Sequence, residues 1–139
     1  MQVVEAMSLG RGDVFDSNCP ARGVLDHVTS RWGVLVLVGL QEGTLRFSEL
    51  KRRVAGVSEK MLSQTLQALE NDGFVWREVY AVVPPRVDYT LTPLGSEVAA
   101  HVEALTDWIE ENVDRIEQAR RARPERVTRV PRRTLALGR

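Results

Sequence analysis

The chain has 139 residues, of which 43% are hydrophobic, and its 19 Lys and Arg residues balance 19 Asp and Glu residues. This length and hydrophobic content predict one globular domain, and a single cysteine excludes an intrachain disulfide framework. The N-terminus lacks a basic segment followed by an apolar run, and the most apolar stretch, residues 34–40, is too short to cross a bilayer. We therefore expect a cytoplasmic protein with no signal peptide and no contact with a membrane.

The zero net charge is a cancellation between two neighbouring segments. Residues 97–114 contain six acidic residues and no Lys or Arg, whereas residues 115–139 contain nine arginines and two glutamates. The last segment, residues 123–139, is basic and contains two prolines, so we expect a disordered tail there. The globular domain is predicted at residues 19–122.

The chain begins with a predicted flexible arm at residues 1–18, followed by two helices. Cys19 and Pro20 indicate a helix start, because proline at the first helical position loses no hydrogen bond. Residues 33–40 are apolar almost all round, which fits a buried strand or a buried helix equally well. We expect a central helix, since Gly43 after this run is typical of a helix C-terminus.

Two short amphipathic helices joined by a tight turn are predicted next. The first covers residues 47–54; Lys51 stands three residues after Ser48, so no capping box is expected there. Gly56 allows the sharp turn, and Ser58 is expected to cap the second helix. On a helical wheel the second helix has an apolar side and an opposite polar side. The apolar side holds Leu62, Thr65, Leu66 and Leu69, and the polar side holds Lys60, Ser63, Gln64 and Gln67.

After Gly73 the hydrophobic period changes from that of a helix to two. Residues 74–80 and 86–91 predict paired strands, and the prolines of residues 81–85 predict the loop between them. Thr92 and Pro93 then indicate the start of a long helix that runs to about residue 121. Its apolar positions recur at spacings of three and four: Val98, Val102, Leu105, Trp108, Ile109, Val113 and Ile116.

This order of elements predicts a mainly α fold with a small β-hairpin wing, namely a winged helix-turn-helix. Ser and Gln side chains can hydrogen-bond to base edges in the major groove, and Lys or Arg can contact phosphates. Such a face is often only a solvated surface, and winged helices also serve as protein-interaction adaptors. Both functions stay open, and DNA binding is the preferred hypothesis. The predicted contacts are Ser58, Lys60, Ser63, Gln64 and Gln67 in the major groove, with Arg52 and Arg86 on the backbone or minor groove.

Six segments occur in the order typical of one family of regulators: residues 19–20, 31–32, 46–50, 57–62, 69–73 and 83–95. Through them the chain resembles the HxlR-type transcriptional regulators, relatives of the MarR-like winged-helix proteins. The resemblance implies a bacterial or archaeal homodimer that binds double-stranded DNA at a pseudo-palindromic operator. It would place the recognition helix at residues 58–71, the wing at residues 76–91, and the dimer interface on the N- and C-terminal helices. The arginine-rich tail is not part of this pattern.

Cys19 is a candidate redox sensor. A thiol at a helix N-terminus lies near the positive end of the helix dipole, which favours the reactive thiolate. Some members of the resembled family sense oxidants or electrophiles through the matching cysteine; the alternative is an inert, buried thiol. His27 and His101 are too few for a metal site. Because no phosphate-binding glycine loop or catalytic carboxylate pair is evident either, we predict no enzyme activity and no cofactor.

The long C-terminal helix predicts a homodimer. Its apolar stripe, which includes Trp108, is longer than the core of so small a domain can cover. Pairing of two copies about a two-fold axis would bury the stripe, and it would place two recognition helices about one DNA turn apart, ~34 Å.

Overall fold

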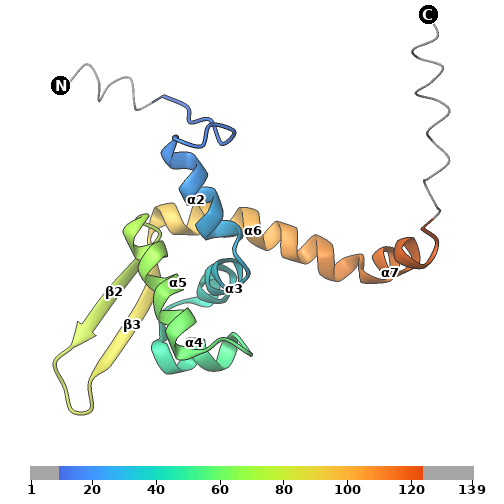
Figure 1. Ribbon diagram of the computed structural model, residues 1–139. Coiled ribbons are helices and arrows are strands. Elements are labelled where there is room, and N and C mark those ends of the chain that lie inside the picture. Colours follow the sequence, from blue (N-terminus) through green and yellow to red (C-terminus); the bar gives the residue numbers. More distant parts are fainter. Residues whose placement is uncertain (1–9, 124–139) are drawn as a thin grey trace, which may run out of the picture. The chain divides into compact units, whose positions relative to one another are not determined.

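The computed structural model describes residues 10–123 of the chain, and Figure 1 shows their helices and strands. The chain divides into two compact units, Met1–Leu105 and Thr106–Arg139. Half of the predicted arm and almost all of the predicted tail lie outside the described residues. The helices are α2 (Pro20–Thr29), α3 (Arg31–Gly39), the 3-10 turn η1 (Leu40–Glu42), α4 (Phe47–Arg53), α5 (Glu59–Asn71), α6 (Pro93–Glu111) and α7 (Val113–Arg121).

The wing is part of a three-stranded antiparallel sheet. Strands β2 (Val75–Tyr80) and β3 (Arg86–Leu91) form the predicted hairpin, and a short strand β1 (Leu45–Arg46) pairs with the other edge of β3. The sequence analysis did not predict β1, because a two-residue strand has no periodicity to detect. Through β1, the segment that enters α4 is fixed to the wing.

The core of the first unit joins the helices to the sheet. The largest fully buried side chains come from α3, α4, α5 and β2, and α5 contacts both α3 and β2. Burying one such aliphatic side chain stabilises the fold by roughly 1.5–3 kcal/mol. The position and angle of α5 are therefore set by its apolar side. These core residues are Val36, Leu37, Leu50, Leu62, Leu66, Leu69 and Val75.

The start of α6 approaches the backbone of the residue before β2 very closely. Thr92 caps this helix, as predicted: its hydroxyl accepts from the Gly95 amide at 2.9 Å and donates to the Gly73 carbonyl at 2.6 Å. A Cβ atom at Gly95 would overlap the carbonyl oxygen of Phe74. Only glycine fits at this position, and the contact holds the base of the wing against α6.

The prediction of one continuous helix from residue 93 to about 121 is wrong at one point. The helix ends at Glu111, and α7 begins at Val113, because Asn112 adopts φ −122° and ψ 17°. The Asn112 side chain donates to the carbonyl of Trp108 at 2.8 Å. Asparagine side chains compete in this way for backbone groups and so disfavour helix interiors.

No capping box was expected from Ser48, but the helix has a capping contact that begins at Arg46 instead. The helix α4 begins one residue earlier than Ser48, with Arg46 at the N-cap position. The side chain of Glu49, three residues on, accepts a hydrogen bond from the Arg46 amide at 2.8 Å. This is the acidic half of a capping box; the arginine side chain has no acceptor with which to supply the other half.

Candidate nucleic-acid interface

The polar side of α5 lies on the surface, opposite the buried leucines. Gly56, with φ +94°, makes the turn before the helix, and Ser58 Oγ accepts from the Met61 amide at 3.1 Å, as predicted for the cap. Gly73, with φ +85°, follows the end of the helix. The four predicted contact residues within α5 are all exposed: Lys60, Ser63, Gln64 and Gln67.

The structure divides these residues between two sides of α5. Ser63 and Gln67 line a cleft toward the wing, whereas Gln64 lines a smaller hollow toward α2. Lys60 precedes both on the first turn of the helix. The polar side therefore spans the width of α5, from its border with α2 to its border with the hairpin.

A hydrogen bond between side chains fixes α2 against the C-terminal end of α5. Nδ1 of His27 lies 2.6 Å from Oδ2 of Asp72, the residue that follows the last turn of α5. The sequence analysis did not predict this pair, since 45 positions separate its members. Together with the buried leucines, it holds α5 at both its apolar side and its end.

On the wing, Arg86 is bound by a carboxylate of its own strand. Its Nε and Nη2 atoms donate to the two carboxylate oxygens of Asp88, each at 3.0 Å, and its guanidinium lies 5.0 Å from the centre of the Tyr80 ring. These hydrogen bonds hold the pKa of Asp88 below its ordinary value. Residues two apart on a strand share a face, so the spacing of Arg86 and Asp88 was a signal that sequence reasoning missed. The positive charge of Arg86 is thus partly offset inside the protein.

Cys19 occupies the N-cap position of α2, as predicted, and is partly buried. Its Sγ atom accepts a hydrogen bond from the backbone amide of Asp13 at 3.3 Å. The thiol therefore links the segment before α2 to the start of that helix. The chain has no second thiol, because Cys19 is its single cysteine.

Comparison with known proteins identifies the family. A model of the HxlR-like helix-turn-helix family matches residues 27–117, a span that contains α4, α5 and the whole wing. The chain belongs to the HxlR-like family. The HTH-type transcriptional regulator YtfH of Escherichia coli (strain K12) is 59% identical to it over 115 residues, which cover 83% of this chain and 91% of YtfH. The family resemblance and the winged-helix fold predicted from the sequence are confirmed.

Solved structures of HxlR-like relatives share the fold. The transcriptional regulator ytfH from Salmonella typhimurium matches with a TM-score of 0.78 and 58% identity, over 80% of this chain and 99% of that chain. The redox regulator HypR in its reduced form matches with a TM-score of 0.64 and 35% identity, over 71% and 98% of the two chains. The chain is thus a member of a family of transcriptional regulators, and its relatives are regulators rather than enzymes.

The described part of this HxlR-like chain offers little other chemistry. Residues 10–123 contain no group of three or more His, Cys, Asp or Glu side chains placed to hold a metal ion. Within the same span, no helix is long and apolar enough to cross a lipid bilayer. The candidate functional features of the described residues are therefore α5, the wing and Cys19.

Proposed function

We propose that this HxlR-like regulator binds double-stranded DNA in a sequence-specific manner, with the polar side of α5 in the major groove. One observation carries the proposal: three buried leucines, Leu62, Leu66 and Leu69, fix α5 while its opposite side presents Ser63, Gln64 and Gln67 to solvent. A rigid helix with short hydrogen-bonding side chains on its free side suits contact with base edges.

The other predicted residues have supporting roles in this proposal. The hydroxyl of Ser58, although it accepts from the Met61 amide, still has a proton to donate to a phosphate. Lys60 and Arg52 are exposed cations on α5 and α4 that suit phosphate contacts. Arg86 remains a proposed contact of the wing, weakened by its pairing with Asp88.

We further propose that the protein acts in the cytoplasm as a homodimer on a pseudo-palindromic operator. Large apolar side chains at the end of α6 and the start of α7 are about half exposed: Leu105 at 53%, Trp108 at 52% and Val113 at 46%. Exposed apolar area of this kind favours association. A two-fold dimer would present two copies of α5 to successive turns of one face of the DNA.

The test of DNA binding is selection of duplexes from a random-sequence library with the purified full-length protein, followed by fluorescence anisotropy. The proposal predicts one preferred inverted repeat, bound with an affinity that falls steeply with salt. A protein-interaction adaptor would instead bind DNA weakly and with no enriched sequence, and that result would refute the proposal.

Modulation through Cys19 is part of the same proposal, and two observations support it: a thiol at a helix N-terminus, and a relative described as a redox regulator. A thiol that holds the Asp13 amide changes its contacts when it is oxidised or alkylated. Operator affinity is measured before and after treatment with iodoacetamide or diamide, with the Cys19→Ser variant as the control. Unchanged affinity of the treated wild type would exclude sensing.

A further inference from the structure

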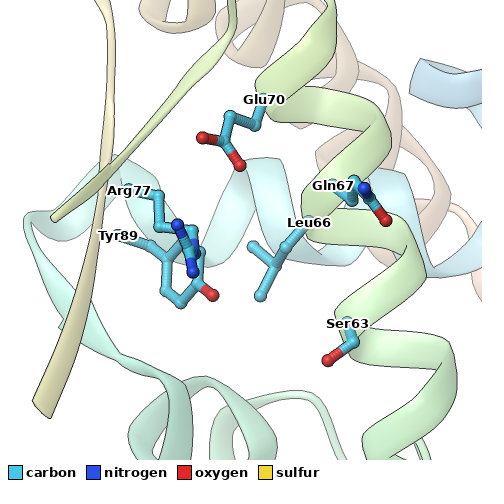
Figure 2. Close-up of a pocket in the computed structure, with 6 residues that line it drawn as sticks. All are labelled: Ser63, Leu66, Gln67, Glu70, Arg77 and Tyr89. Atoms are coloured by element: carbon cyan, nitrogen blue, oxygen red, sulfur yellow. The ribbon is translucent and has the colours of Figure 1, made fainter. Parts of the chain in front are cut away.

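A cleft of about 410 Å³ separates α5 from the wing. Figure 2 shows Ser63, Leu66 and Glu70 of α5 on one side, and Arg77 of β2 with Tyr89 of β3 on the other. Leu66 and Tyr89 are buried, whereas Arg77 and Ser63 are exposed. The cleft therefore has an apolar floor and hydrogen-bonding groups along its rim.

The position of the cleft restricts what can enter it when DNA is bound. This step rests on the proposed function, in which α5 lies in the major groove and the wing reaches the adjacent minor groove. The strand backbone that separates two adjacent grooves must then cross between α5 and the hairpin. A phosphate of that strand passes over the cleft whatever the base sequence.

The charge on the wing side of the cleft suits a phosphate. Among residues 10–123, no carboxylate oxygen lies within 4.0 Å of the Arg77 guanidinium, whereas Arg86 is bound by both oxygens of Asp88. Arg77 is thus the hairpin arginine with its charge uncompensated by a direct ion pair. Burial raises the pKa of Tyr89, so its hydroxyl keeps its proton near neutral pH and can donate.

The helix side of the cleft carries groups of opposite effect. The exposed hydroxyl of Ser63 can donate to a phosphate oxygen. Glu70, two turns further along α5, places a partly buried carboxylate at the same cleft. Its charge repels a phosphate, so the cleft has an attractive side and a repulsive side.

We propose that this cleft binds a DNA phosphate of the strand between the two grooves, with Arg77 as its principal ligand, Ser63 and Tyr89 as hydrogen-bond donors, and Glu70 as a group that weakens the contact. Arg77 then contributes to affinity for every sequence and positions α5 in the groove. Glu70 limits non-specific binding, because it opposes the contact that all sequences share.

Substitutions on the two sides of the cleft should have opposite effects on affinity for the selected duplex. Arg77→Ala should weaken binding by roughly tenfold or more and lower the slope of log affinity against log salt by about one. Arg77→Lys should retain most of the affinity, because a phosphate accepts a point charge. Glu70→Gln should tighten binding by about threefold. Arg53→Ala is the matched control, since Arg53 of α4 is already paired with Glu42 of η1, and it should leave affinity unchanged.

A chemical change in the DNA tests the contact directly. Neutral methylphosphonates are placed one at a time along the selected duplex, and wild type and Arg77→Ala are compared at each position. At one phosphate per half-site, the wild type should bind the methylphosphonate duplex more weakly than the unmodified duplex. Arg77→Ala, which is already weakened, should bind the two duplexes almost equally, and this non-additivity indicates a direct contact. Thermal melting of each variant confirms that it is folded.

The outcomes separate this inference from the proposed function. Equal losses for wild type and Arg77→Ala at every methylphosphonate, with sequence preference intact, would overturn the phosphate contact alone. If Arg77→Ala and Glu70→Gln changed the affinity for the selected duplex in the same direction, the phosphate contact would also be overturned. If selection enriches no sequence, the proposed function fails and the phosphate contact fails with it.

Discussion

Replacing Gly95 by alanine tests how the base of the wing is held against α6. The added Cβ would overlap the carbonyl oxygen of Phe74, which already accepts a hydrogen bond from the Thr92 amide at 3.0 Å. Moving that carbonyl costs about 1 kcal/mol for the weakened hydrogen bond and roughly 1–3 kcal/mol for the forced shift. Alanine returns up to about 1 kcal/mol through its helix propensity. We therefore expect a net destabilisation of about 1–3 kcal/mol.

The same substitution at Gly23 is the matched control. Gly23 lies within α2, and beyond its chain neighbours and the backbone of its own helix a Cβ atom there would meet no atom within 4 Å. Gly23→Ala should therefore stabilise the protein by roughly 0.5–1 kcal/mol, through helix propensity alone.

Thermal melting followed by circular dichroism measures both variants at the same protein concentration. At roughly 4 °C per kcal/mol for a domain of this size, the two melting temperatures should differ by on the order of 10 °C and lie on opposite sides of wild type. A Gly95→Ala protein that melts at or above the wild-type temperature would refute the close approach of α6 to Phe74.

Three further predictions concern the wing, the dimer and α4. The pKa of Asp88 is held low by Arg86, so the ion pair stabilises the fold above the ordinary pKa of 3.8, and this stability is lost as the pH falls below that value. Asp88→Asn should therefore remove the acid-side loss of stability from thermal melts recorded across pH. An unchanged pH profile would argue against the ion pair. Trp108→Glu, a charge at a half-exposed apolar position, should shift the protein toward monomer in sedimentation velocity, and a dimer of wild-type stability would contradict the proposed interface. Arg52→Ala should weaken all duplexes alike and lower the salt slope by about one, whereas a selective effect on one sequence would assign Arg52 to base contact.

Local signals in the sequence predicted most of the fold. Pro20 at the start of α2, Gly56 at the turn and Ser58 at the cap each act through neighbouring backbone atoms, so their effects are visible in the chain itself. The change of period after Gly73 located the hairpin to within one residue. Such features need no knowledge of distant contacts.

Features that depend on distant or very short segments were not predictable in this way. The strand β1 exists because its two residues pair with β3, more than forty positions away. The hydrogen bond of His27 with Asp72 depends on how α2 packs on α5. The break at Asn112 interrupts a stripe of apolar residues that otherwise continues through it, so periodicity alone favoured one long helix.

The candidate site shows the same division. The helical wheel of α5 separated buried from exposed residues, because the period of 3.6 determines which side packs. The wheel does not reveal that Ser63 lies toward the wing and Gln64 toward α2, because that depends on where the hairpin lies. The contrast between Arg77 and the paired Arg86 likewise became visible only with the hairpin in place.

If the polar side of α5 contacts DNA bases, then Gln64→Ala must change which base pairs the protein prefers. Wild type and variant are titrated against the selected duplex and against single base-pair substitutions of it, with Gln118→Ala on α7 as an exposed glutamine control. We expect Gln64→Ala to lose about 1–3 kcal/mol of discrimination at particular base pairs, while its binding to random DNA is retained. An unchanged order of preference among the substituted duplexes would contradict the assignment of α5 as the recognition helix.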